Sequence, residues 1–283
     1  LLISGARMAV RLMGTLYLVA TPIGNFDDMT IRALRVLGDV ALVAAEDTRS
    51  ARRLLDHFDV NARVTSYNEH NKSAKTPAIL DALAEGDVAV VSDAGMPGIS
   101  DPGHDLVVAA LAAGHNVVPI PGASAVLAAV AASGLPSRRF YYLGFLPRQS
   151  GPRRRALIEA AALGDTLVVF ESPHRVVATM TDALAALGDR RIAVCRELTK
   201  VYEEIWRGPI SDAIAHFAQP RGEFTLIIEG GAAPSAGDAA PADVPSIVAT
   251  LKAEGLTAKD GVAALMKRAK LPRRAAYAAW HEA

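Results

Sequence analysis

Residues 92–103, with the sequence SDAGMPGISDPG, combine three glycines, two prolines and two aspartates in twelve positions. Glycine lets a backbone approach a ligand closely, and proline fixes the shape of a loop. The segment follows an apolar, β-branched run at 88–91 and precedes a helical pattern that begins at Asp105. Because ligands of open α/β sheets bind beyond the carboxyl ends of the strands, the segment predicts a ligand-binding loop. A tight strand-to-helix turn with Asp101 as the helix N-cap would account for any single residue, but less well for the whole cluster.

The chain lacks the sequence motifs of several common kinds of binding and catalysis. It has no G-x-x-x-x-G-K-[ST] loop, no G-x-G-x-x-G after a strand and no G-x-S-x-G elbow. The seven histidines are scattered without ligand spacing, so we expect no metal, although Asp93 and Asp101 could hold one with Glu46 or Asp47. The single cysteine, Cys195, excludes a disulfide framework and fits a reducing, cytoplasmic location.

The remaining features suit a group transfer in which a cofactor carries the reactivity and the protein positions it. S-adenosylmethionine needs acceptors for its ammonium and ribose groups, donors for its carboxylate and an apolar slot for its adenine. Asp93 and the carbonyls of residues 94–99 would supply acceptors. A helix that begins after Ser124 would supply N–H donors at its N-terminus.

Predicted strands and helices alternate along the first half of the chain, and they must position these loops. Apolar runs that predict buried strands are followed by helical patterns five times, which favours a parallel sheet covered by helices. The predicted strands are 15–20, 40–45, 64–66, 88–91 and 116–120. Loops rich in proline and glycine follow three of them, at 21–25, 92–103 and 121–125.

The 283 residues are enough for about two domains, and they divide by pattern. We expect an N-terminal α/β domain at 14–132 and a C-terminal α/β domain with a mixed sheet at 133–230, because strand patterns there follow one another without a helix. Residues 231–245, rich in Ala, Pro and Gly, predict a linker, and 246–283 a small helical region. The first thirteen residues are too short to span a bilayer; we interpret them as a disordered remnant or an extended start, and we expect a soluble protein.

Two local concentrations of basic residues predict contact with RNA, although the formal net charge is zero. Residues 137–155 hold six arginines and no acidic residue, and 252–274 hold seven lysines and arginines. A solvated face explains the second run equally well. Tyr141, Tyr142 and Phe145 could stack on bases, but their strand pattern favours a place in the core.

Several motifs together resemble the tetrapyrrole methylase superfamily: TPIGN at 21–25, EDTR at 46–49, the 92–103 loop and PGASA at 121–125. The motifs FESPHR at 170–175, RELTK at 196–200 and GEFT at 222–225 are similar to its ribosomal RNA branch. The resemblance covers residues 14–230 in the same order. It implies two α/β domains with S-adenosylmethionine between them, usually in a homodimer, and a helix-turn-helix-like end. It also implies methylation of a cytidine 2′-hydroxyl in the decoding region of 16S rRNA, within the small ribosomal subunit.

Two other functions fit the same scaffold. One is a small-molecule tetrapyrrole or precorrin methylase, against which stands the first loop, because small-molecule members have a glycine-richer one. The other is a non-catalytic ribosome-binding protein that keeps the fold.

The resemblance also implies roles for individual residues, according to their positions in the motifs. The implied cofactor-binding residues are Pro22, Asp93, Ala94, Gly95, Ile99, Ser124, Ala125, Phe170, Phe224 and Thr225. Phe170 and Phe224 fit equally well as core at strand ends.

The remaining site predictions concern the proton acceptor and the RNA. We expect one of Lys200, Glu197 and Glu171 to accept the hydroxyl proton, with the reservation that an unshifted lysine is protonated at neutral pH. The predicted RNA contacts are Arg49, Arg138, Arg139, Arg148, Arg153, Arg154 and Arg175. As an alternative, Glu46, Asp47 and Arg49, or Glu171 and Arg175, are charge pairs that hold loops together.

Overall fold

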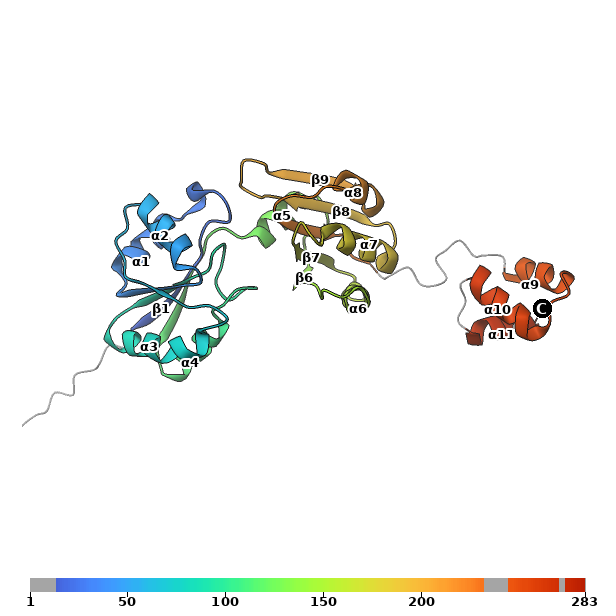
Figure 1. Ribbon diagram of the computed structural model, residues 1–283, viewed down its shortest axis with the longest axis horizontal. Coiled ribbons are helices and arrows are strands. Elements are labelled where there is room, and N and C mark those ends of the chain that lie inside the picture. The colour runs from blue at the N-terminus through green and yellow to red at the C-terminus, as the bar shows by residue number, and fades with distance from the viewer. Residues whose placement is uncertain (1–13, 232–243, 270–272, 283) are drawn as a thin grey trace, which may run out of the picture.

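The computed structural model describes residues 14–231, 244–269 and 273–282, which form two five-stranded sheets, the helices that cover them and three further helices at the C-terminal end (Figure 1). The predictions for residues 1–13 and for most of the 231–245 linker fall outside these ranges. Within the described part of the chain, no helix is long and apolar enough to cross a membrane.

The first sheet is parallel, as its alternating pattern predicts. Its strands are β1 (Thr15–Val19), β2 (Leu42–Ala45), β3 (Val64–Ser66), β4 (Val88–Val91) and β5 (Asn116–Ile120). They lie in the order β3-β2-β4-β1-β5. Because β4, β1 and β5 are neighbours, the three loops rich in proline and glycine meet at one edge of the sheet.

Helices cover both faces of this sheet (Figure 1). One face carries α1 (Ile31–Asp39) and α2 (Thr48–His57), and the other carries α3 (Lys72–Glu85) and α4 (His104–Ala112). A 3₁₀ turn, η1 (Phe26–Asp28), precedes α1. Asp47 caps α2 by accepting a hydrogen bond of 2.8 Å from the Arg49 N–H, which fixes the start of that helix at the edge where the loops meet.

The second sheet is mixed. It contains β6 (Phe140–Phe145), β7 (Thr166–Glu171), β8 (Arg191–Arg196), β9 (Glu204–Pro209) and β10 (Phe224–Ile228), in the order β6-β7-β10-β8-β9. Only β6 and β7 run parallel; the other neighbours are antiparallel.

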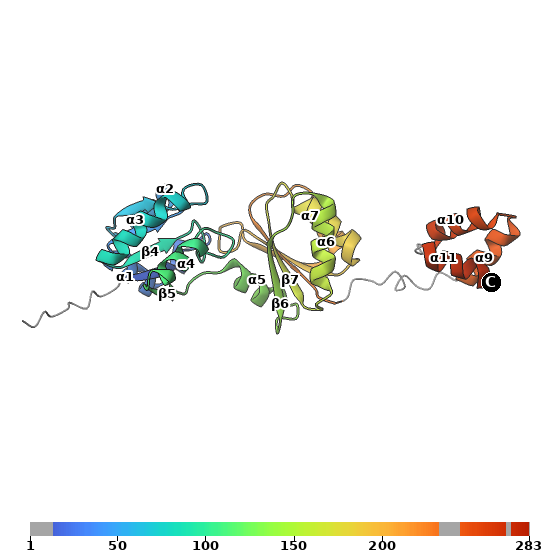
Figure 2. The same ribbon diagram turned by 90° about the horizontal axis from the view of Figure 1, so that it is seen from below.

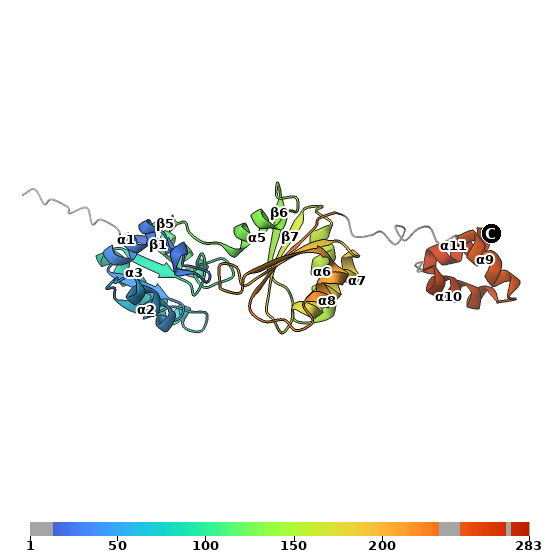
Figure 3. The same cartoon turned by 90° about the horizontal axis from the view of Figure 1, so that it is seen from above.

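Helix α5 (Ala125–Ser133) packs on this second sheet, not on the first. It lies on the face opposite α6 (Ser150–Ala161), α7 (Val176–Leu187) and α8 (Ile210–His216) (Figures 2 and 3). Ala129 and Val130 of α5 share a core cluster with Ala193 and Ile227. Because of this packing, the boundary between the two α/β domains lies before α5, whereas the sequence pattern places it after residue 132. A helix built from alanine and valine is apolar on every side, so its sequence does not show which sheet it covers.

The three C-terminal helices are α9 (Val244–Ala253), α10 (Ala258–Arg268) and α11 (Arg273–Glu282). They pack on one another around a small core that includes Val248, Leu265 and Trp280. They lie in the helical region predicted at 246–283, except that α9 begins two residues earlier.

Candidate active site

The loop at 92–103 folds back on itself and is fastened to the loop after β1. Thr21 and Gly95 exchange two backbone hydrogen bonds of 2.9 and 3.1 Å, and the Thr21 hydroxyl donates to the Ser92 carbonyl at 3.1 Å. At Gly103 the φ angle is +151°, and a Cβ there would lie 2.9 Å from a backbone nitrogen of the same loop. These contacts make the loop compact, and glycine is required at 103.

A cavity of about 660 Å³ lies between this loop and the second sheet, which is an ordinary size for a ligand site. It is bordered by the loops after β1, β4 and β5 and by residues of β6, β7, β8 and β10. Eight of the ten predicted cofactor residues line it: Ala94, Gly95, Ile99, Ser124, Ala125, Phe170, Phe224 and Thr225.

The groups around this cavity fit S-adenosylmethionine. Ser124 is the N-cap of α5 and lines the cavity with Ala125 and Val126, so the first turn of α5, with its free N–H groups, borders the space. Such N–H groups suit a carboxylate. Carbonyls of the 92–103 loop can accept hydrogen bonds, and Ile23 and Ile99 are part of an apolar surface suited to an adenine ring.

An aromatic wall closes one side of the cavity. Phe170 lies against Tyr142 and Phe145, with ring centroids 5.2 and 5.8 Å apart. Phe145 is 57 % exposed and Tyr141 45 %, so the core interpretation is wrong for both and holds only for Tyr142. The reason is that β6 is an edge strand, which leaves these two side chains uncovered. Phe224 is buried and borders the cavity from the core, so both interpretations apply to it.

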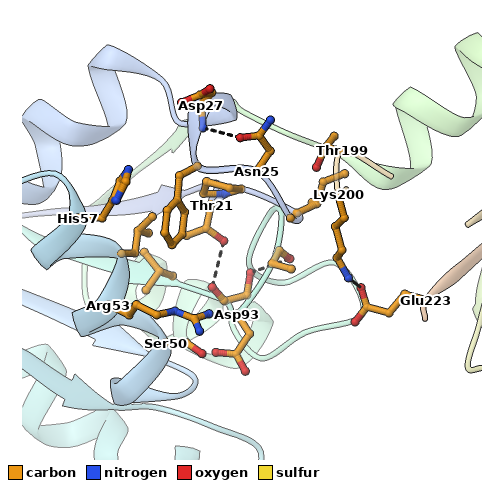
Figure 4. Close-up of a pocket in the computed structure, with 18 of the residues that line it drawn as sticks. Thr21, Asn25, Asp27, Ser50, Arg53, His57, Asp93, Thr199, Lys200 and Glu223 are labelled. Atoms are coloured by element: carbon orange, nitrogen blue, oxygen red, sulfur yellow. Dashed lines mark hydrogen bonds and ion pairs between the residues drawn. The ribbon is translucent and has the colours of Figure 1, made fainter. Parts of the chain in front are cut away.

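Two of the predicted cofactor residues, Pro22 and Asp93, do not line this cavity. They line a second cavity of about 1020 Å³ beside it (Figure 4). The bridge between Thr21 and Gly95 fixes the backbone so that Pro22 and Asp93 face this second space. The residues common to both cavities are Ile23, Ala94 and Glu223.

Lys200 is held by two carboxylates. Its Nζ donates to Glu197 at 2.9 Å and to Glu223 at 2.8 Å. Burial opposes its charge, but these hydrogen bonds prevail and raise the pKa of Lys200, so it is protonated at neutral pH. Burial likewise opposes ionisation of Glu197, but the Glu223 N–H and Lys200 lower the pKa of that carboxyl. In this arrangement neither side chain is poised to accept a proton.

The turn that carries Lys200 has an uncommon backbone. Glu197 and Thr199 have φ angles of 52° and 66°, in the left-handed region that few residues other than glycine adopt. The stem of Lys200 crosses Gly24, where a Cβ would lie 2.3 Å from the lysine Cγ. Lys200 therefore connects the second domain to the first loop of the first domain.

Glu171 is buried, and both of its carboxylate oxygens have partners within the protein. Its carboxylate accepts hydrogen bonds from the Ser172 N–H at 2.9 Å and the Thr179 hydroxyl at 2.7 Å, and Arg175 lies 3.3 Å away. This is the arrangement that the alternative of a loop-holding pair predicts. Glu171 orders the loop after β7, which leaves its oxygens unsuited to taking a proton from a substrate.

Asp101 has an environment that the sequence does not reveal. It lines the first cavity, where burial and the nearby charges of Glu46 and Asp93 raise its pKa to about 7. Burial also raises the pKa of Glu46, which accepts a hydrogen bond of 3.2 Å from the Asp93 N–H, and that of Asp93 itself. The expected helix-capping role is wrong, because Gly103 is the N-cap of α4. Among the described residues, no group of three or more His, Cys, Asp or Glu side chains is placed to hold a metal ion.

Two of the predicted RNA contacts are structural instead. Arg153 is only 5 % exposed and donates from Nε to Asp182 at 2.8 Å. Arg175 donates to the Leu146 carbonyl at 2.6 Å and pairs with Glu171. Arg153 is not available to RNA because it falls on the inner face of α6, which composition alone does not show, whereas Arg175 is partly exposed and held by Glu171 at the end of β7.

The other predicted RNA-binding arginines are exposed: Arg49, Arg138, Arg139, Arg148 and Arg154. Arg49 pairs with Asp47 at 2.6 Å, and Arg139 pairs with Asp165 at 3.0 Å. These surface pairs are weak enough for a phosphate to replace.

Comparisons with known proteins agree with this geometry. The family model described as Tetrapyrrole (Corrin/Porphyrin) Methylases matches residues 15–214. A protein of Halalkalibacterium halodurans named "Ribosomal RNA small subunit methyltransferase I" is 53 % identical over 220 residues, 77 % of this chain and 76 % of that protein. One of the same name from Synechocystis sp. is 46 % identical over 277 residues, 94 % of this chain and 96 % of that protein.

Solved structures show the same fold at low identity. Diphthine synthase matches 76 % of this chain and 89 % of its own with a TM-score of 0.61 and 15 % identity. The match to uroporphyrin-III-C-methyltransferase from Thermus thermophilus covers 76 % of this chain and 94 % of that protein, with a TM-score of 0.53 and 20 % sequence identity. Methyl transfer from S-adenosylmethionine is the chemistry of the matched family. By the extent of these matches, the chain belongs to the tetrapyrrole (corrin/porphyrin) methylase family.

Proposed function

We propose that this protein transfers the methyl group of S-adenosylmethionine to the 2′-hydroxyl of a cytidine ribose in the decoding region of 16S rRNA. The names of relatives at 53 % and 46 % identity support a small-subunit rRNA substrate. The choice of ribose and nucleotide rests on the resemblance of the motifs at 170–175, 196–200 and 222–225 to the ribosomal RNA branch.

One observation carries the proposal: eight residues assigned to the cofactor by sequence border one cavity of suitable size. There, the first turn of α5 would hold the carboxylate of S-adenosylmethionine, the 92–103 loop its polar groups, and the apolar wall its adenine. When bound, the cofactor supplies an electrophilic methyl group on a sulfonium. The protein's part is to orient the acceptor oxygen and take its proton.

Asp101 is our choice for the proton acceptor. The hydroxyl oxygen forms a bond to the methyl carbon, the carbon–sulfur bond breaks, and the hydroxyl proton passes to the Asp101 carboxylate. A carboxyl with a pKa of about 7 is ionised in a large fraction of molecules at neutral pH and is a stronger base than an ordinary aspartate. Lys200, Glu197 and Glu171 would first have to break the bonds that engage them.

The proposal includes a homodimer that works in the cytoplasm, where its ribosomal substrate is located. Support for the dimer comes from the family resemblance and from apolar side chains that α4 and the edge strand β5 expose: Val108, Leu111 and Val118. Replacing Leu111 by Glu should shift the mass measured by light scattering towards a monomer.

Transfer of tritiated methyl groups to small ribosomal subunits from a strain lacking the modification tests the proposal. We expect label in the 16S rRNA. Label in a tetrapyrrole but not in RNA would indicate a small-molecule methylase, and binding to subunits without transfer would indicate a non-catalytic ribosome-binding protein.

A further inference from the structure

The cavity of about 1020 Å³ is larger than the cavity of about 660 Å³ proposed for the cofactor, and only two of the ten predicted cofactor residues line it, Pro22 and Asp93. Its walls come from the first loop and η1, from α2, from Asp93 and Ala94, and from residues 199–202 of the second domain (Figure 4). Because it shares Ile23, Ala94 and Glu223 with the cofactor cavity, a group bound beside these residues adjoins the cofactor.

One end of this second cavity is aromatic. The rings of Phe26 and His57 lie 4.5 Å apart, tilted by 40°, and both pack against Phe58. Buried Ala51 and Leu54 of α2 also line the cavity. Aromatic faces over an apolar surface suit the stacking of a nucleobase, because every base has a flat face.

The charges in the cavity are mixed. Arg53 points toward Ser50 and Asp93 (Figure 4). Within the part of the chain that the structure describes, no carboxylate lies within 4.0 Å of Arg53, so its charge is available to a ligand. Asp27, Asp93 and Glu223 also line the space.

This balance discriminates between ligands. Lys200 also lines the space and pairs with Glu223, so the three carboxylates outnumber the lysine and arginine side chains by one, which disfavours a polycarboxylate such as a tetrapyrrole. A nucleotide instead offers a phosphate to Arg53, and amino and hydroxyl donors to carboxylate oxygens, which are suitable acceptors for the amino group of cytosine.

The rim of the cavity presents further stacking surface. Tyr202 is 72 % exposed beside it, on the turn that the Lys200 network holds in its left-handed conformation. Thr199 lines the cavity, and its φ angle of 66° lies in the left-handed region. Residues held in such uncommon conformations are concentrated at active sites and ligand-binding sites.

We propose that this cavity receives the acceptor cytidine after it swings out of the RNA chain, an inference that rests on the proposed function. The base stacks at the Phe26 end, and Arg53 neutralises a phosphate. The ribose lies at the wall shared with the cofactor cavity, with its 2′-hydroxyl directed into that cavity, which Asp101 lines. A nucleotide that leaves the RNA stack needs a pocket for its base, and the cavity is large enough for a nucleotide.

Two variants and a matched control test the assignment. Arg53→Ala removes the cation, and Phe26→Leu removes the ring but keeps apolar volume. Arg52→Ala is the control, because Arg52 is the exposed neighbour on α2 and does not line the cavity. Steady-state methyl transfer to unmodified small subunits gives kcat and KM, titration with S-adenosylmethionine gives its Kd, and thermal melting confirms folding.

We expect Arg53→Ala and Phe26→Leu each to lower kcat/KM for subunits by about tenfold, with the Kd for S-adenosylmethionine within about twofold of wild type. Arg52→Ala should match wild type. Unchanged kcat/KM in both folded variants would overturn the assignment, and so would an equal loss of cofactor affinity. Failure of the wild-type protein to methylate RNA would instead refute the proposed function, and this inference with it.

Discussion

The carboxyl group of Asp101 lies among other carboxyl groups at the wall of the cofactor cavity. Burial, with the charges of Glu46 and Asp93, raises its pKa to about 7. Groups with such shifted pKa values are concentrated at functional sites, because an acid or base works best when its pKa is close to the working pH.

If Asp101 accepts the proton, the rate must follow its ionisation. We predict that kcat rises with pH through about 7 in the wild-type protein. Asp101→Asn should lower kcat by about a hundredfold or more and abolish this rise, while S-adenosylmethionine still binds. Single-turnover methyl transfer from pH 5.5 to 9 measures the profile. An Asn variant that keeps the wild-type profile would assign the proton to another group.

The same shift makes a prediction about stability. An aspartate in the unfolded chain has a pKa of about 3.9, below the folded value of about 7. The folded state thus holds the proton more tightly, so the stability contributed by Asp101 is fully present below about pH 4 and is lost as the pH rises through 7. We predict that wild type loses melting temperature relative to Asp101→Asn between pH 5 and 8. If the difference in melting temperature between the two proteins did not change with pH, the raised pKa of Asp101 would be contradicted.

At the scale of elements, the glycines of the 92–103 loop hold the shape on which the cofactor cavity depends. Gly103→Ala would place a Cβ 2.9 Å from a backbone nitrogen at a φ of +151°. We predict a loss of about 1–3 kcal/mol in stability and weaker binding of S-adenosylmethionine. Gly151→Ala is the control, because nothing lies within 4 Å of a Cβ there and the site is helical. Urea unfolding and cofactor titration measure both effects; equal behaviour of the two variants would show that the loop tolerates the change.

Much of the element pattern could be predicted from sequence. Buried parallel strands such as β4 are continuous apolar runs, and the strand-end loops mark where each run stops. Because parallel strands end at one edge, the pattern places the three loops at that edge, but the strand order that makes them neighbours was not predicted. The family resemblance, not the strand pattern, implied that Ser124 and Gly95 share a site, and both line one cavity.

Other features depend on the packing of distant segments and leave no local signal. The apolar composition of α5 does not identify the sheet that it covers. The burial of Arg153 depends on Asp182, which is far away in sequence. The second cavity forms only where η1 and α2 meet residues 199–202, so its ligand could not be inferred from any one motif.

At the scale of the molecule, the site exists only because the two domains meet. Ser100 and Tyr142 form a hydrogen bond of 2.7 Å between them, and Lys200 crosses Gly24. Each cavity takes residues from both domains. Changes at this junction should therefore affect cofactor and acceptor binding together, unlike changes at Arg53.

The C-terminal helices form a core of their own, and neither cavity includes their residues. Lys252, Lys259 and Arg268 are exposed on them, which suits contact with phosphates. We predict that a protein ending at Ala240 binds small subunits about tenfold or more weakly but keeps its affinity for S-adenosylmethionine. Filter binding and cofactor titration separate the two quantities. A large loss of cofactor affinity would contradict this division of roles.

Nucleoside mass spectrometry can show whether the protein methylates the ribose of one cytidine in 16S rRNA. Unmodified small subunits are incubated with the protein and S-adenosylmethionine, and their 16S rRNA is digested and analysed. We predict 2′-O-methylcytidine in a fragment of the decoding region with the wild-type protein but not with Asp101→Asn. A methyl group on a base, or no methylated nucleoside in the RNA, would contradict it.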